Sequence, residues 1–190
     1  MSYVRFCLWR RRARGPRMHF LIEKMAIDQD TRVLKLLNGL KCRERDKLEL
    51  AARELKQFVD STSRKMSSET FTKFMNHLTP KMFSLIQSAD TNEQMGGLYA
   101  IDGLIDVSSE DDEAKVIRFS NYLRNFFVQP TSSIETLEMA SKTLGHLARA
   151  GGTLTADFVD FEVKRSLEWL QGERYDHNQD YRRLTACLVG

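Results

Sequence analysis

The sequence predicts an all-α fold in which antiparallel helix pairs stack into an α-solenoid. Three observations predict this class. The 190 residues include only 3 prolines and 10 glycines, so few residues interrupt a helix. Apolar residues recur three and four positions apart from Thr31 onward, and no segment alternates as a strand does. Similar helices also recur along the chain at nearly regular intervals, as they do in repeat proteins.

Eight helices are expected, each with an apolar face at helical spacing. In chain order they span residues 31–40, 43–60, 67–88, 90–107, 114–128, 134–150, 153–170 and 181–189. Asn38 and Gly39 suit the end of the first helix. Ser67 and Asp90 suit the N-caps of the third and fourth helices. Pro80 predicts a kink or a break inside the third helix.

The remaining boundaries carry similar signals. Ser108 or Ser109 would cap the fifth helix, and the acidic stretch at 108–113 would favour the positive end of its dipole. A metal site is the alternative interpretation of those carboxylates. Ser132 or Ser133 is expected to begin the sixth helix, and the pair Gly151-Gly152 separates it from the seventh.

A repeat is visible in the second, fourth, sixth and eighth helices. Their alanines can be placed in register at separations of 49, 40 and 46 residues: Ala51, Ala100, Ala140 and Ala186. Apolar residues follow four and seven positions later: Leu55, Leu104, Leu144, Phe58, Val107 and Leu147. Bulkier, aromatic-rich helices lie between them. Two helices in about 40–47 residues is the HEAT or armadillo period.

Three glycines interrupt the fourth helix, at Gly96, Gly97 and Gly103. Each costs a helix about 1 kcal/mol relative to alanine. We expect small residues here because stacked helices need them where their backbones approach closely, so that packing offsets the lost helix propensity. A flexible glycine hinge is the alternative.

The N-terminal segment differs from the rest. Residues 1–24 have a charge balance of +6, and the remaining residues a balance of −3. A mitochondrial transit peptide and a basic arm for membrane or nucleic acid are two interpretations. The third is translated upstream sequence, with Met18 or Met25 as the usual start. We expect residues 1–24 to be a basic, disordered extension and residues 25–190 to form HEAT-like repeats, truncated at the C-terminus.

The sequence offers no catalytic, cofactor-binding or metal site, and we expect none in this chain. Neither the cysteines nor the histidines have ligand spacing: Cys7, Cys42, Cys187, His19, His77, His146 and His177. No serine has a GxSxG context, and Gly96-Gly97 lacks the following GK[ST] of a phosphate loop. No basic stripe suits direct nucleic-acid binding, and no run approaches the roughly 18 apolar residues of a membrane span.

Two groups of residues leave alternatives open. Trp169 and the pair Phe126-Phe127 are either core between adjacent hairpins or anchors for a partner. Lys164-Arg165 and Arg182-Arg183 are expected to face solvent or to pair with neighbouring acids. The partner-contact residues are therefore unknown at this level.

Several long strings resemble the N-terminal HEAT repeats of the target of rapamycin (TOR) serine/threonine-protein kinases. They are LLNGLKCRERDKLELAARELKQFV, DTNEQMGGLYAIDGLIDV, RFSNYLRNFF and EMASKTLGHLARAGGTLTADFVDFEVKRSLEWL, followed by GER and Arg182-Arg183. The likeness runs from about Thr31 to the end of the chain. Residues 1–30 have no recognisable counterpart, which favours Met25 as the natural start.

The resemblance implies a segment of a very large kinase that uses ATP and Mg, with its catalytic domain at the far C-terminus. The family controls nutrient-responsive cell growth and works in complexes with helical-repeat partners such as Raptor. It implies a cytoplasmic protein, including at lysosomal, vacuolar or other endomembrane surfaces through complex partners. The expected function is a non-catalytic scaffold, and an independent helical adaptor that binds TOR-complex-like partners is the alternative.

No kinase motif can be carried over to this chain. Residues 43–46 (RERD) and 157–159 (DFV) only faintly resemble the catalytic and metal-binding loops, with Val159 where glycine belongs. We interpret them as surface charge and a buried Phe158. The last predicted helix ends at Gly190 with Leu184, Ala186, Leu188 and Val189 uncovered, so we expect a truncated array rather than a capped one.

Overall fold

The structure is a computed structural model that describes residues 31–108, 112–129 and 133–171. All regular elements within these ranges are helices, which confirms the all-α prediction there. The expected extension at 1–24, the last helix at 181–189 and Ala186 lie outside the described residues, so the predictions for them stay predictions. The helix contacts described below lie within the compact unit that begins at Leu36.

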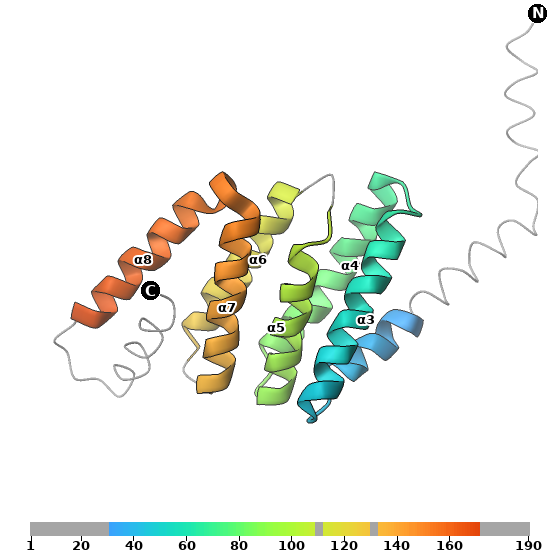
Figure 1. Cartoon of the computed structure of the whole chain (residues 1–190), viewed down its shortest axis with the longest axis horizontal. Coiled ribbons are helices and arrows are strands. Elements are labelled where there is room, and N and C mark those ends of the chain that lie inside the picture. The colour runs from blue at the N-terminus through green and yellow to red at the C-terminus, as the bar shows by residue number, and fades with distance from the viewer. Residues whose placement is uncertain (1–30, 109–111, 130–132, 172–190) are drawn as a thin grey trace, which may run out of the picture. The chain divides into compact units, whose positions relative to one another are not determined.

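The helices follow the predicted order. Residues 31–39 are helical, followed by α3 (Arg45–Ser63), α4 (Ser68–Ile86), α5 (Thr91–Ile105), α6 (Asp112–Phe127), α7 (Ile134–Gly151), the 3-10 turn η1 (Gly152–Thr155) and α8 (Ala156–Gln171). Helix α5 packs against α3, α4 and α7, and α6 packs against α7. In Figure 1, α3, α5 and α7 lie side by side in one layer, with α4 and α6 behind them. The fold is therefore a two-layer helical-repeat solenoid.

Small residues lie buried at close approaches in α3, α5 and α7. Ala51, Ala100 and Ala140 are all buried, as the repeat predicted. A Cβ on Gly96 would lie 1.9 Å from the carbonyl oxygen of Leu40, and one on Gly97 would lie 2.6 Å from Cγ1 of Ile86. The larger residues of the repeat fill the space around them, and all are buried: Leu55, Leu104, Leu144, Phe58, Val107 and Leu147. Packing thus accounts for the first two glycines.

Gly103 is the exception. The nearest atom to a Cβ added there is Cβ of Lys56, at 3.7 Å, so packing does not require a glycine at this position. That part of the prediction is wrong, because Gly103 lies on a side of α5 that leaves room for a side chain. Helix α5 nevertheless continues without interruption through all three glycines, which supports packing over the hinge alternative.

Side-chain caps begin three of the helices as predicted. Ser67 Oγ accepts a hydrogen bond from the amide of Thr70 at 3.4 Å, and Asp90 Oδ1 accepts one from the amide of Asn92 at 2.7 Å. Ser133 caps α7 by accepting from the amide of Thr136 at 3.2 Å. Asp112 and Glu113 occupy the first turn of α6, where acidic side chains favour the helix dipole. Ser109 and Ser132 lie outside the described residues.

Pro80 does not break its helix. Helix α4 continues through it from Ser68 to Ile86, so the predicted break is wrong. A proline removes one backbone donor and leaves one carbonyl without its helical partner. That carbonyl belongs to Asn76, four residues before Pro80. Buried residues on both sides of Pro80 hold the two halves of α4 in place.

The last described helix starts later than predicted. Gly152 has a φ of +51°, which favours glycine. It ends α7 and begins η1, so α8 starts at Ala156 rather than Thr153. Much of the apolar surface of this segment is exposed: Leu154, Phe161, Val163, Leu167 and Leu170. The side chains that α8 buries are Glu162 and Ser166.

The aromatic pair predicted as either core or partner anchor belongs to the core. Phe126 and Phe127 are both fully buried, and their rings meet edge to face with centroids 6.3 Å apart. They are therefore not available to a partner. Trp169 is half-buried, and the guanidinium of Arg165 lies over its ring at 4.6 Å.

Candidate partner-binding site

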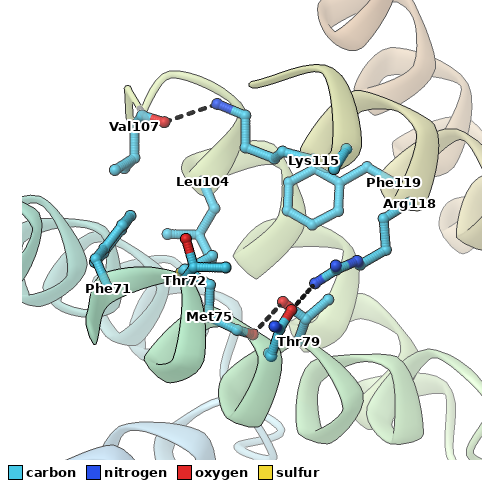
Figure 2. Close-up of a pocket in the computed structure, with 11 residues that line it drawn as sticks. Phe71, Thr72, Met75, Thr79, Leu104, Val107, Lys115, Arg118 and Phe119 are labelled. Atoms are coloured by element: carbon cyan, nitrogen blue, oxygen red, sulfur yellow. Dashed lines mark hydrogen bonds between the residues drawn. The ribbon is translucent and has the colours of Figure 1, made fainter. Parts of the chain in front are cut away.

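A groove lies between α4 and α6. Its lining residues are Phe71, Thr72, Met75, Asn76, Thr79, Leu104, Val107, Ala114, Lys115, Arg118 and Phe119. We call it the α4–α6 groove. In Figure 2, side chains of α6 face those of α4 across it, above Leu104 of α5. The cavity measures about 40 Å³, which suits the tip of one apolar side chain and is far too small for a nucleotide.

The groove exists because the two layers pack differently. Helix α5 packs closely against α3 and α7, whereas α4 and α6 are not packed against each other in this way. Large side chains connect them instead. The rings of Phe83 and Tyr122 stack with centroids 3.9 Å apart and planes 18° apart, so an aromatic pair holds α4 and α6 together beside the groove.

Two cations line the groove, and they differ in what they can still bind. Lys115 Nζ donates to the carbonyls of Ile105 and Val107 at 3.0 and 2.7 Å, and pairs with Asp112 at 2.8 Å. It therefore satisfies the C-terminal end of α5. Arg118 reaches across the groove, where its Nη1 donates to Asn76 Oδ1 at 2.9 Å. Since a guanidinium has five donors, Arg118 is the cation that suits an incoming carboxylate.

The surface of the α3–α5–α7 layer carries polar pairs that connect successive helices. Lys41 pairs with Glu93 at 2.9 Å. The phenol of Tyr99 donates to Glu49 at 3.0 Å and accepts from Arg45 at 3.1 Å. Hydrogen bonds from Ser88 and Lys41 lower the pKa of Glu93. These pairs are exposed, so each contributes little stability, but together they favour one alignment of the helices.

The histidines of the described ranges lie on separate helices and have different neighbours. No group of three or more His, Cys, Asp or Glu in the described ranges is arranged to hold a metal ion. His146 does lie between Asp102 and Asp106, but its Nδ1 and Nε2 point to different carboxylates, each at 2.9 Å. Metal ligands must instead converge on one point. His77 Nε2 lies 2.8 Å from Lys81 Nζ.

The two kinase-like strings lie on helices. Arg45 and Asp46 of RERD begin α3, and the DFV string at 157–159 lies in the first turn of α8. Phe158 is half-buried rather than buried, with the guanidinium of Arg124 at 5.2 Å from its ring centroid. Lys164 is exposed and pairs with Asp160 at 2.6 Å, and Arg165 is largely buried and pairs with Glu162. Both therefore pair with neighbouring acids, as predicted. Arg182 and Arg183 lie outside the described residues.

Sequence analysis missed the residues of the α4–α6 groove and the partners of His146. The partners of His146 had a weak signal in the sequence. His146 follows Asp102 and Asp106 by 44 and 40 residues, and these separations are close to the repeat period. The groove has no sequence signal of its own, since its lining residues read as ordinary positions of amphipathic helices.

These features together define a class of protein: an all-α helical-repeat array. Of the helices in the described ranges, none is both long and apolar enough to cross a membrane. No family model matches the chain, and no solved structure matches it.

Curated relatives identify the family. The chain is 43% identical over 139 residues to the serine/threonine-protein kinase tor1 of Schizosaccharomyces pombe, 40% over 141 residues to the kinase TOR of Oryza sativa, and 39% over 144 residues to the kinase TOR2 of Saccharomyces cerevisiae. The matches cover 73–74% of this chain and 6% of each relative. The chain is therefore homologous to one segment of the TOR serine/threonine-protein kinases, and spans a small part of their length.

Proposed function

We propose that this chain is a non-catalytic scaffold, equivalent to the N-terminal HEAT repeats of a TOR kinase, that presents helix faces to a partner subunit. The observation that carries the proposal is the match itself. Three TOR kinases match most of this chain at 39–43% identity, and the matched segment makes up 6% of the length of each kinase. The described part of this chain is a helical array with a narrow groove between α4 and α6.

The expected partner is a Raptor-like helical-repeat subunit in nutrient-responsive growth signalling in the cytoplasm. The α4–α6 groove supplies one place for such contact, because its apolar floor and Arg118 suit an apolar side chain next to a carboxylate. Partner contacts commonly combine a buried apolar anchor with a charged rim in this way.

A pull-down with a Raptor-like subunit tests this role. We expect the chain to retain the subunit and Arg118→Glu to weaken retention about tenfold, because the substitution places a carboxylate where an acidic partner group would lie. Arg53→Glu, at an exposed position on the α3–α5 side, is the matched control and should bind normally. No retention by either this chain or a longer N-terminal region would refute the partner role. Equal binding by Arg118→Glu and Arg53→Glu would show that the partner contacts a face other than the α4–α6 groove.

A phosphate-transfer assay tests the non-catalytic part of the proposal. The purified chain, incubated with ATP, Mg²⁺ and a peptide substrate, should transfer no phosphate above a heat-denatured control. The physical reason is that phosphoryl transfer needs a phosphate-binding loop, a base and metal ligands held together, and ATP and Mg belong to the full-length family. Robust transfer by the purified chain would overturn this proposal.

A further inference from the structure

A polar cluster connects three successive helices of the α3–α5–α7 layer. Lys56 of α3 pairs with Asp106 Oδ2 of α5 at 2.5 Å. The imidazole of His146, on α7, reaches back to α5, with Nε2 at 2.9 Å from Asp106 Oδ1 and Nδ1 at 2.9 Å from Asp102 Oδ1. We call these four residues the three-helix clasp. Asp106 is its centre, because it binds both neighbouring helices at once.

The geometry of the clasp depends on the protonation of His146. A neutral imidazole has one N–H donor, whereas the imidazolium has two. Both nitrogens face a carboxylate oxygen at hydrogen-bond distance, so the observed arrangement suits the imidazolium. With Lys56, the protonated clasp has two positive and two negative charges. Loss of the proton removes one hydrogen bond and leaves the cluster with a net charge of −1.

The surroundings allow the proton to exchange while the array stays folded. The side chain of His146 is 26% exposed, and those of Asp102 and Asp106 are 34% and 48% exposed. Other charged groups nearby are Glu49 and Arg53 of α3, which line the same side of α5. On α7 itself, Lys142 one turn before is paired with Glu138 at 2.6 Å, and Arg149 lies almost one turn after.

The electrostatics agree with the geometry. Burial acts to lower the pKa of His146, but the hydrogen bonds to Asp102 and Asp106 outweigh it, so the pKa lies above its ordinary value. The hydrogen bond from Lys56, opposed by partial burial and helped by His146, lowers the pKa of Asp106. Asp106 therefore stays ionised when His146 gains its proton.

We propose that the three-helix clasp is a proton-sensitive coupling between successive repeats: protonated His146 fastens α7 to α5, and its deprotonation loosens that junction. The array is then stiffer on the acidic side of neutrality. The direction follows from linkage. A histidine with a raised folded-state pKa contributes stability that is fully present below its unfolded value of about 6.5 and is lost as the pH rises through the folded value.

Chemical denaturation of the full 190-residue chain at pH 6 and pH 8.5 tests this coupling. We expect the unfolding constant of His146→Gln to exceed that of the wild type about fivefold at pH 6, the size expected for two partly exposed charged hydrogen bonds, and the gap to close at pH 8.5. Lys142→Gln, which removes an exposed pair on α7, is the matched control and should show no such pH-dependent difference. A His146→Gln effect of the same size at both pH values would overturn the proposal.

A titration by NMR gives a second measurement that does not depend on the stability of a variant. The His146 resonance should titrate at a higher pH in the folded chain than in the chain unfolded in urea, and Asp102→Asn should bring its midpoint down. The amides of α7 should exchange more rapidly above this midpoint, after correction for the intrinsic effect of pH. A His146 midpoint in the folded chain at or below that in the unfolded chain would show that the two carboxylates do not hold the proton.

Discussion

Replacement of Gly96 by alanine is expected to destabilise the chain by about 3 kcal/mol. The added Cβ would lie 1.9 Å from the carbonyl oxygen of Leu40 and 2.9 Å from its carbonyl carbon. These are backbone atoms, so no rotamer change can make room. Leu40 is itself fully buried, and its amide donates to the carbonyl of Leu36 at 3.2 Å, so the turn is held in place. Urea denaturation followed by circular dichroism should show a lower midpoint with an unchanged slope.

Gly103→Ala is the matched control in the same helix. A Cβ there meets nothing closer than 3.7 Å, so the gain in helix propensity should stabilise the chain by about 0.5–1 kcal/mol. The two substitutions add the same methyl group to glycines seven positions apart, and their effects should have opposite signs. A Gly96→Ala variant as stable as Gly103→Ala would mean that α5 does not approach Leu40 so closely.

The fold could be predicted from the sequence because its determinants are local or periodic. The caps at Ser67, Asp90 and Ser133 depend on residues two or three positions away, and the buried alanines and leucines recur with the repeat. A sequence shows such patterns directly. The sequence could also indicate that Gly96 and Gly97 lie where helices approach closely. Three glycines lower the stability of a helix, so their presence in a helical pattern favours a packing role.

The remaining features depend on which side chains meet across helices. The α4–α6 groove forms where Met75 of α4 and Phe119 of α6 face each other. The three-helix clasp forms where His146 meets Asp102 of α5 and Asp106 at its C-cap. Helical periodicity gives the face on which a residue lies, but it does not give the neighbour that the face meets. Gly103 shows the same limit, because periodicity could not distinguish it from Gly96.

Helix α8 shows the strongest departure from simple amphipathic patterning. It buries Glu162, with 2% of the side chain exposed, next to Arg165 of the same helix and Arg124 of α6. Arg124 Nε donates to Glu162 Oε1 at 3.3 Å, and its guanidinium lies 4.1 Å from the ring centroid of Phe161. A carboxylate flanked by two guanidiniums and aromatic rings therefore connects α8 to α6. A hydrophobicity pattern would place this glutamate on the surface.

Glu162→Leu is expected to destabilise the docking of α8 by about 3 kcal/mol. The substitution leaves the guanidinium of Arg165, with 11% of the side chain exposed, without its counter-charge and close to a second cation. Glu162→Gln should cost less than half as much, since burial already raises the pKa of Glu162 against the effect of both arginines, and a neutral amide can still accept from Arg124. Trp169, whose ring lies against Arg165, provides a fluorescence probe of α8 during urea denaturation.

Two comparisons determine whether the effect comes from burial of the charges. Asp160→Asn removes a partner of Lys164 on the exposed side of α8 and should change stability by less than about 0.5 kcal/mol. Removal of one member of a buried ion pair destabilises a protein far more than replacement of both members by apolar residues of similar size. The double substitution Glu162→Leu with Arg165→Met should therefore recover at least half of the stability that Glu162→Leu loses. If the double variant is less stable than the single one, the aromatic contacts of Arg165, rather than its pairing with Glu162, hold α8 in place.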